Sequence, residues 1–497
     1  MRYNVLIGGQ AGQGPNILSD LIAKALISNG YYVFYSRDYQ SLIRGGHNFN
    51  FLSFSDSPIA SNSKGIDLLI ALDENTINLH KKNCNKKSII LDGNHPNMYH
   101  AGAIFKILNM DFKILDNELK ELKRRYNENI KEATEGYKSQ KTKINLKQLK
   151  NKNLSFMNGS QAISQAAINS GLDFYYAYPM TPATGVLTEL AQAMKNKKST
   201  HKTIQMENEI AVINTAIGSS MIGKKVMVGT SGGGFDLMTE ALSLTGVAGI
   251  PLVIYLSQRP GPGTGVPTYT AQGDMNIALK AGHGEFPRIV LAPGDPDEAM
   301  TLTSEAFYFS QKYRIPAIII GDKHLAESKY SSDKSPILIE SKNSITKLER
   351  FNSYEKDKEG SATDEPEIII QKIKERLQKK QELKKETKKF ETYNIYGTKN
   401  SKNVIIAWGS TKGAIIDALP DIDAKFIQIM YLEPFPDISK ELKNKNIIVI
   451  ENNATSPLSD LISEQLQMKI DNKNKILKYD SREFSSDDIV NEVKKRT

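Results

Sequence analysis

Residues 173–194 read DFYYAYPMTPATGVLTELAQAM, and they place a strand, a rigid turn and an amphipathic helix in direct succession. The apolar run FYYAY predicts a strand, and ATGVLTELAQAM has the spacing of a helix with one apolar face. Pro179 and Pro182 fix the turn between them. In open α/β sheets ligands bind beyond the carboxyl ends of the strands, so this turn predicts a binding site that includes the Thr181 hydroxyl.

A second segment, QMENE at 205–209, supplies two carboxylates at the start of an Ala/Ile-rich helix, EIAVINTAIGSSMIG. A carboxylate at such a position can be desolvated and take part in proton transfer. Glu207 and Glu209 are therefore candidate functional residues.

The surrounding chain predicts an α/β protein with three α/β domains. Strand and helix patterns alternate over 1–118, 154–329 and 401–497, and the charged segments 119–153 and 330–400 read as linkers. Apolar runs without alternation in the middle domain indicate a parallel sheet covered on both faces. The other expected strands include FKIL, which occurs at 105–108 and 112–115, and KFIQIMYL at 425–432.

The net charge of +9 is concentrated in two segments. Residues 111–153 carry a surplus of five basic residues and residues 367–391 a surplus of four. These segments are either solvated helical linkers or a docking surface for an acidic redox partner. Basic residues on one face with interleaved aromatics, as nucleic-acid binding requires, are not evident, so no nucleic-acid partner is expected.

Composition excludes several other classes. Cys84 is the only cysteine, so the chain has no internal disulfide and lacks the roughly four ligands of an iron–sulfur cluster. A single cysteine, no signal-peptide pattern and no long apolar run together predict a cytoplasmic protein without a membrane span. The seven histidines show no metal-binding spacing, so no metal ligand is expected on this chain.

The N-terminal strand YNVLIGG leads into a glycine-rich turn and then a helix. Backbone amides at a helix start suit an anion, and glycine lets the ligand approach closely. The turn can bind a dinucleotide or another anionic ligand, or it is a structural or subunit-facing turn. Asp38 is a poor match for the acidic residue of a dinucleotide site. The sequence RGGH at 44–47 is a second polar turn. The candidate residues of the first turn are Gly9, Gln10, Gly12, Gln13 and Gly14.

Two further turns follow strands of the middle domain. GTSGGGF at 229–235 lies between a strand and a helix and lacks the Lys-Ser/Thr ending of a P-loop, so it is either a close-packed crossover or part of a cofactor site. QRPGPGTG at 258–265 presents Arg259, whose guanidinium can bind a carboxylate. The non-periodic stretch that continues to Asp274 is a candidate lid or partner-contacting loop.

Together these segments resemble the 2-oxoacid:ferredoxin oxidoreductases, in the form of an α subunit with the γ domain fused at its N-terminus. The γ-like part is IGGQAGQG with RGGHNFNF. The α-like part is AYPMTPAT, QMENEIAVINTAIG, GTSGGGFDLMTEAL and SQRPGPGTGVPTYTAQGDM, followed by HGEFPRIVLAPGDPDEA. YLEPFP, VIENN and KYDSREF resemble the family's transketolase-type C-terminal domain.

The resemblance implies a division of labour between two chains. This chain would contact the aminopyrimidine of thiamine diphosphate, while a β subunit would hold the diphosphate, Mg²⁺ and a [4Fe–4S] cluster. The chain would be inactive alone, would assemble as αβ or (αβ)₂, and would convert a 2-oxoacid and coenzyme A to acyl-CoA and CO₂ while reducing ferredoxin. 2-Oxoglutarate is favoured, with pyruvate or a branched-chain oxoacid as alternatives; a nucleotide-dependent dehydrogenase and a non-catalytic scaffold subunit are the other interpretations.

The resemblance also assigns residues. Glu209 would bond the aminopyrimidine ring nitrogen; since positions two apart on a helix face in different directions, Glu207 would not. Thr181 and Arg259 would hold the oxoacid, with Thr264 in the same loop. Tyr178, Pro179, Ser231 and Gly232 would line the cofactor site.

The sequence departs from the family pattern at four places. GPGTG at 261–265 replaces the common GPSTG, TSGGG replaces the usual TSGPG, and Gly249 stands where many relatives carry a glutamate. Tyr269 replaces a basic residue, which predicts a substrate without a second carboxylate and weakens the case for 2-oxoglutarate.

Overall fold

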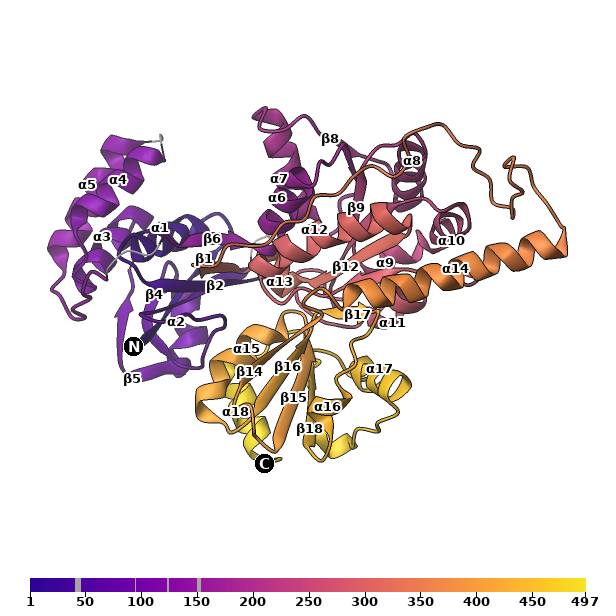
Figure 1. Cartoon of the computed structure of the whole chain (residues 1–497). Helices are drawn as coiled ribbons and strands as arrows, with labels where there is room; N and C mark the ends of the chain where they lie inside the picture. Colours follow the sequence, from indigo (N-terminus) through magenta and orange to yellow (C-terminus); the bar gives the residue numbers. More distant parts are fainter. Residues whose placement is uncertain (41–45, 94, 123–124, 150–152) are drawn as a thin grey trace. The chain divides into compact units, whose positions relative to one another are not determined.

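The computed structural model describes the whole chain except residues 41–45, 94, 123–124 and 150–152, so Arg44 and Gly45 of the RGGH turn lie outside the described residues. The chain forms two compact units. Unit 1 comprises Met1–Met157, Ser328–Lys334 and Ser485–Asp487, and unit 2 comprises Asn158–Glu327, Ser335–Phe484 and Asp488–Thr497. Figure 1 shows the elements of both.

Unit 1 is built on a seven-stranded mixed sheet of order β5-β4-β1-β3-β2-β13-β6. β1 pairs in parallel with β4 and antiparallel with β3, which also pairs antiparallel with β2. The strands are β1 (Arg2–Gln10), β2 (Tyr32–Tyr39), β3 (His47–Ser55), β4 (Ile66–Ala71), β5 (Cys84–Leu91), β6 (Ser155–Asn158) and β13 (Lys329–Ser332).

The helices of unit 1 pack on this sheet and on one another. Gly102 and Gly136 let two of them, α3 and α5, touch along their backbones, because a Cβ at either position would lie 1.9 Å from a carbonyl oxygen of the other helix. The helices are α1 (Pro15–Ser28), α2 (Glu74–His80), η1 (Lys81–Asn83), α3 (Asn97–Ile107), α4 (Phe112–Glu121) and α5 (Tyr126–Ser139). The strand prediction for FKIL was wrong at both occurrences. The copy at 105–108 forms the end of α3, and the copy at 112–115 lies in α4. Helical context overrides the strand preference of such short apolar runs.

The central sheet of unit 2 has the order β17-β11-β12-β10-β9-β7-β8, and all neighbours are parallel except β11 and β17. Helices pack on both of its faces. The strands are β7 (Phe174–Ala177), β8 (Lys202–Gln205), β9 (Val226–Thr230), β10 (Leu252–Gln258), β11 (Ile289–Leu291), β12 (Pro316–Asp322) and β17 (Tyr431–Glu433). The helices are α6 (Gly159–Asn169), α7 (Thr184–Lys195), α8 (Glu209–Met221), α9 (Gly232–Asp236), α10 (Thr239–Ala248), α11 (Met275–Lys280), α12 (Pro296–Tyr313) and α13 (Lys323–Glu327).

A third sheet follows in the same unit, of order β14-β16-β15-β18-β19. KFIQIMYL, expected as one strand, divides between β16 of this sheet and β17 of the central sheet. The strands are β14 (Tyr393–Gly397), β15 (Asn403–Trp408), β16 (Lys425–Ile429), β18 (Asn446–Glu451) and β19 (Lys475–Leu477). The helices are α15 (Thr411–Ala418), η2 (Leu419–Asp421), α16 (Ser439–Leu442), α17 (Pro457–Leu466), η3 (Asn472–Asn474) and α18 (Ser486–Lys494). The central and third sheets are mostly parallel and the sheet of unit 1 is mixed, and together with their helices they confirm the predicted α/β class.

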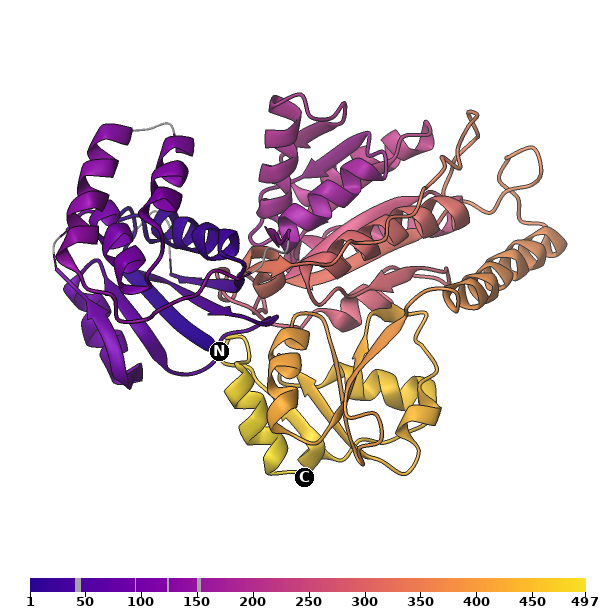
Figure 2. The same ribbon diagram turned by 60° about the vertical axis from the view of Figure 1, so that its left-hand side comes forward.

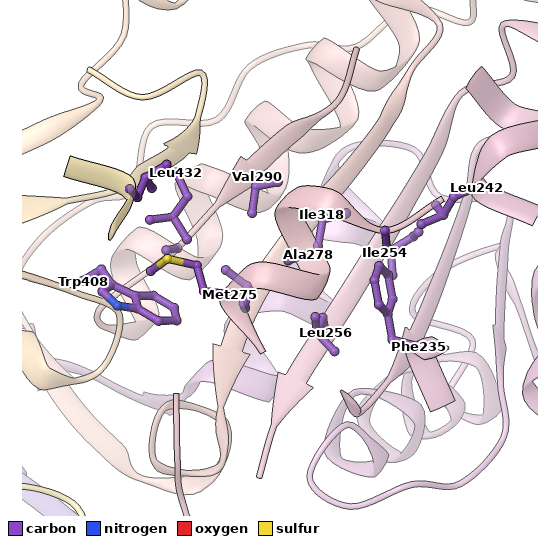
Figure 3. Packing of buried hydrophobic residues seen from close by; sticks show 14 of the residues in the cluster. Phe235, Leu242, Ile254, Leu256, Met275, Ala278, Val290, Ile318, Trp408 and Leu432 are labelled. Atoms are coloured by element: carbon purple, nitrogen blue, oxygen red, sulfur yellow. The ribbon is translucent and has the colours of Figure 1, made fainter. Parts of the chain in front are cut away.

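One hydrophobic core connects the central and third sheets of unit 2. Trp408 and Leu432 belong to the same cluster of buried residues as Leu256 and Val290, and Met275 and Ala278 of α11 lie among them (Figure 3). The short helix α11 is therefore held by buried side chains on both sides, and this packing fixes the position of its first residue, Met275.

The basic segment 367–391 forms most of helix α14 (Pro366–Thr387), which extends away from the sheets of unit 2 in both views (Figures 1 and 2). Its carboxyl end is anchored where Glu386 accepts hydrogen bonds from Lys312 and Tyr308 on α12 at 2.6 Å each. Ile370 and Leu377 on its other turns are exposed.

Candidate active site

The four motifs of the middle domain converge at one edge of the central sheet. QMENE follows β8, YPMTP follows β7, TSGGG follows β9 and QRPG follows β10, and these four strands are parallel neighbours in the order β8-β7-β9-β10. The chain passes from β7 to β8 on one side and returns to β9 on the other, so the strand order reverses at β7. Such a switch point is where open α/β sheets bind ligands.

Glu209 is the first residue of α8, and its carboxylate is buried with 4% of the residue exposed. Asn208 caps the helix by accepting a hydrogen bond from the Ala211 amide at 2.8 Å, which fixes the direction of the first turn. Glu207, two residues earlier, is exposed. Among the described residues, Glu209 Oε1 has no hydrogen-bond partner. A buried acceptor without a partner is costly, so this oxygen indicates a ligand donor at that point.

The first turn of α9, made by Gly232, Gly233 and Gly234 and called the triple-glycine turn, packs directly on this carboxylate. A Cβ on Gly234 would lie 2.1 Å from Thr230 Oγ1 and 2.7 Å from Glu209 Oε1, so only glycine fits there. Ser231, just before α9, is fully buried, and within the described part of the chain its hydroxyl also lacks a partner. The turn thus brings a second unpaired polar group to the site of Glu209.

Arg259 and Thr181 are in direct contact across the sheet edge. Arg259 Nη1 donates to the Thr181 carbonyl oxygen at 2.8 Å, which orients the guanidinium and leaves its other N–H groups for a ligand. Both residues are half-buried, and burial lowers the pKa of Arg259 while Asp274 opposes that shift. Tyr178 and Pro179 of the same turn are exposed at the rim.

Thr264 lies apart from this contact, in the exposed stretch 261–266 of its loop. The later part of the loop is firmly attached to the third sheet. Gln272 Nε2 donates to the Trp408 carbonyl oxygen at 3.0 Å, and Gln272 Oε1 accepts from the Asn452 amide at 3.0 Å. Residues 270–274 therefore cannot swing as a lid without breaking buried hydrogen bonds.

Asp274 is a site residue that the sequence argument did not single out. It precedes α11 at the position where aspartate normally caps a helix, yet its side chain makes no capping hydrogen bond. Its carboxylate instead lies against the triple-glycine turn, 2.6 Å from where a Cβ on Gly232 would be. Its amide donates to the buried side chain of Gln258 at 2.9 Å, beside Arg259. Burial, with help from Asp236, raises the pKa of Asp274 to about 6, against the effect of Arg259.

Tyr269 replaces the basic residue of the family pattern, but an arginine from elsewhere in the chain lies over its ring. The guanidinium of Arg482 lies 3.6 Å above the centre of the Tyr269 ring. A positive charge is therefore present at this part of the loop after all, contributed by the C-terminal segment.

In unit 1, the glycine turn between β1 and α1 borders a hollow of 280 Å³. Gly12 and Gly14 line it, with Arg37 and Asp38, whereas Gly9, Gln10 and Gln13 do not. The side chain of Gln13 stabilises its own turn, because its Oε1 accepts a hydrogen bond from the Gln10 amide at 2.6 Å. β3 separates β1 from β2, whereas a dinucleotide-binding unit pairs these strands directly, so the topology argues against that interpretation.

The described residues contain neither a group of three metal-binding side chains nor a helix with the length and apolar character of a membrane span.

Comparison with known proteins identifies the family. The family model for pyruvate ferredoxin/flavodoxin oxidoreductase matches residues 4–125, and the model described as pyruvate flavodoxin/ferredoxin oxidoreductase, thiamine diphosphate-binding, matches 165–396. The 2-oxoglutarate synthase subunit KorA of Methanocaldococcus jannaschii is 31% identical over 60% of this chain and 88% of that protein. The chain belongs to the 2-oxoacid:ferredoxin oxidoreductase family.

Other family members match over the full length. The 2-oxoacid:ferredoxin oxidoreductase subunit alpha of a Sulfolobus species is 28% identical, over 98% of this chain and 96% of that protein. The fold is that of the 2-oxoglutarate:ferredoxin oxidoreductase from Magnetococcus marinus, solved with 2-oxoglutarate, coenzyme A and succinyl-CoA bound: the TM-score is 0.88 at 22% identity, over 100% of this chain and 99% of that one. The chain is thus a subunit of an oxidoreductase complex, with a thiamine diphosphate-binding domain.

Proposed function

We propose that this chain is the fused γ/α subunit of an oxidoreductase that converts 2-oxoglutarate and coenzyme A to succinyl-CoA and CO₂ and passes two electrons to ferredoxin. The observation that carries the proposal is the buried Glu209 carboxylate with an unpaired oxygen, at the same edge of the sheet as the contact between Arg259 and Thr181. Pyruvate and branched-chain oxoacids remain the alternative substrates.

The residues present fit thiamine diphosphate. Among the described residues, Glu209 Oε1 and the Ser231 hydroxyl are buried polar groups without a partner. The absence of a side chain at Gly234 allows the backbone to pack closely on Glu209. Glu209 would accept or share a proton at the aminopyrimidine ring nitrogen, while Tyr178, Pro179 and Gly232 would border the ring. When bound, thiamine diphosphate supplies a nucleophilic carbon that adds to the substrate carbonyl and accommodates the electron pair released on decarboxylation.

Arg259 would bind the carboxylate of the 2-oxoacid, because a guanidinium pairs with two carboxylate oxygens at once. Its bond to the Thr181 carbonyl holds it in place before the substrate arrives, which reduces the entropy lost on binding. Thr264 would reach the substrate only if the exposed part of its loop folds inward. Arg482 over Tyr269 supplies a charge for a second carboxylate, which supports 2-oxoglutarate over pyruvate.

The remaining parts would come from a partner. A β subunit would hold the diphosphate, Mg²⁺ and a [4Fe–4S] cluster, since the described residues of this chain offer no metal-binding group of three and its single cysteine cannot bind a cluster. The assembly would be αβ or (αβ)₂ and cytoplasmic. The hollow beside Gly12 and Gly14, with Arg37, is the candidate site for an anionic group of coenzyme A.

Reconstitution tests the proposal. The chain is expressed with and without a β subunit, and reduction of methyl viologen is followed with a panel of 2-oxoacids, coenzyme A, thiamine diphosphate and Mg²⁺. We expect activity only from the two-chain complex, with 2-oxoglutarate preferred and coenzyme A required. NAD-dependent turnover by the lone chain would indicate a dehydrogenase instead. A complex that forms but turns over no 2-oxoacid would indicate a scaffold.

A further inference from the structure

Helix α14 keeps its negative charges occupied and leaves positive charges exposed. Three of its four glutamates already accept a hydrogen bond from a nearby side chain; the pairs are Glu386 with Lys312, Glu375 with Lys372 and Glu382 with Gln378. Lys374, Lys384 and Lys385 of the same helix are exposed, and among the described residues they form no ion pair. The helix therefore presents uncompensated positive charge to solvent.

The same helix also exposes a stripe of large apolar side chains. Ile370, Ile373 and Leu377 are 51%, 38% and 52% exposed, and their spacing of three and four positions places them on one side of the helix. Lys374 lies four positions after Ile370 and Lys384 seven positions after Leu377, so these cations flank the stripe. Exposed apolar surface with a charged border is typical of a contact site, whereas a purely solvated helix does not require it.

A groove of 680 Å³ runs beside this stripe. Ile373 and Leu377 line one wall, and the opposite wall includes Phe286, just before β11, and Leu461 of α17. The second wall is firmly held, because the Arg288 guanidinium lies 4.6 Å from the centre of the Phe286 ring and donates a hydrogen bond to a backbone carbonyl at 2.6 Å. An apolar groove beside a helix is a surface into which a segment of another protein can pack.

The border of the groove is polar, and its charge selects the kind of partner. Ion pairs hold several of the polar side chains that line it: Lys380 with Glu433, Lys280 with Glu464 and Arg376 with Glu355. An apolar centre inside a polar rim is the anatomy of a protein–protein interface. Helix α14 has no aromatic side chain on which a nucleic-acid base could stack. A second α14 would bring the same positive charge, so the charges favour an acidic protein as the partner.

We propose that the exposed face of α14 and the adjoining groove dock ferredoxin, whose carboxylates would meet Lys374, Lys384 and Lys385 around an apolar contact on the stripe. Ferredoxins are small acidic proteins, so the two charges are complementary. This inference rests on the proposed function, which names ferredoxin as the electron acceptor but gives it no site on this chain. Docking changes no covalent bond, and its effect is to speed and orient the encounter with the acceptor.

The test compares two electron acceptors of the reconstituted complex: a two-cluster [4Fe–4S] ferredoxin of low isoelectric point, and methyl viologen, a small cation that needs no acidic docking partner. One variant reverses three charges of α14, and a control reverses three exposed charges of the other basic segment; the substitutions are Lys374→Glu, Lys384→Glu and Lys385→Glu against Lys131→Glu, Lys138→Glu and Lys141→Glu. At low salt we expect KM for ferredoxin to rise about tenfold or more in the α14 variant and less than about twofold in the control. The kcat for viologen reduction should stay unchanged in both.

Two further measurements locate the contact. Wild-type KM for ferredoxin should rise between about 20 mM and about 500 mM salt, because salt screens exposed charges, whereas KM of the α14 variant should change little. Leu377→Ser should raise KM for ferredoxin at every salt concentration, because an apolar contact is not screened. Carbodiimide joins lysine amines to carboxylates, and cross-linking of the wild-type complex to ferredoxin should therefore occur at the lysines of α14, as mass spectrometry of the products would show.

Four results would overturn the proposal. Equal KM values for ferredoxin in the α14 variant and the control would do so, as would cross-links confined to lysines outside α14. Loss of viologen reduction in step with the loss for ferredoxin would show that α14 holds the complex together instead. Binding to vesicles of anionic lipid that the α14 variant loses while its KM for ferredoxin stays unchanged would assign this face to a membrane. Wild-type complex that turns over no 2-oxoacid even with viologen would refute the proposed function, and the inference with it. If the α14 variant does not fold, the wild-type cross-links and salt dependence decide the matter.

Discussion

Alanine substitutions at two adjacent glycines, Gly233 and Gly234, test the close packing at the active site. A Cβ on Gly234 would meet Thr230 Oγ1 at 2.1 Å and Glu209 Oε1 at 2.7 Å, whereas a Cβ on Gly233 would meet nothing within 4 Å. Because overpacking a tight site costs about 1–3 kcal/mol, Gly234→Ala should lower the free energy of unfolding by that amount. Gly233→Ala should leave it unchanged or raise it by up to about 1 kcal/mol, since alanine restricts the unfolded chain more than glycine.

The two variants should differ more in activity than in stability. Relief of the clash in Gly234→Ala requires the Glu209 carboxylate to move, and a displacement of about 1 Å at a reacting group can cost about a hundredfold in rate. Urea denaturation of the chain gives the free energies, and viologen reduction by the reconstituted complex gives kcat. If Gly234→Ala matches Gly233→Ala in both measurements, Glu209 is not held against this turn as described.

Two further variants probe charges at the site, and a third probes the buried ion cluster of Lys412, Asp295 and Glu298 elsewhere in unit 2. Asp274→Asn should stabilise the protein above pH 6. Because the pKa of Asp274 is about 6 in the folded protein against the ordinary 3.8, the wild type loses at most about 3 kcal/mol of stability as the pH rises between these values, and asparagine removes that loss. If urea denaturation gives the same difference in stability between variant and wild type at pH 4 and at pH 7.5, the prediction is contradicted. Arg259→Lys should raise KM for the 2-oxoacid about tenfold or more with little change in unfolding, because lysine cannot form the paired contact, and an unchanged KM would argue against Arg259 as the carboxylate ligand. Lys412→Met leaves Asp295 and Glu298 without their shared buried cation and should cost about 3–5 kcal/mol by urea denaturation, whereas a loss under 1 kcal/mol would indicate that water replaces it.

The sequence was sufficient to predict the α/β class and the edge of the sheet where the motifs meet. Each motif stands directly after an apolar run, and parallel strands end at one edge, so strand-to-turn order alone places Thr181, Glu209, Ser231 and Arg259 together. The sequence also favours Glu209 over Glu207, but its reason, two positions on one helix, does not hold: α8 begins at Glu209, which is buried, and Glu207 lies before the Asn208 cap and is exposed.

What the sequence could not provide depends on contacts between distant segments. Asp274 reads as an ordinary helix cap, and only the fold reveals that its carboxylate lies on Gly232, 42 positions earlier. Arg482 lies over Tyr269 because the C-terminal segment returns to the loop, which no local pattern encodes. KFIQIMYL divides between two sheets for the same reason, since its apolar run satisfies either partner.

In the proposed function, the buried Glu209 carboxylate activates the cofactor. Glu209→Gln keeps the size of the side chain but cannot exchange a proton, and Glu207→Gln is the matched control at an exposed position. The measurement is kcat for viologen reduction with 2-oxoglutarate and coenzyme A by the reconstituted complex of each variant. We expect Glu209→Gln to lose about a hundredfold or more while the complex still assembles, and Glu207→Gln to stay within about twofold of the wild type. Full activity in Glu209→Gln, or an equal loss in both variants, would contradict the assignment.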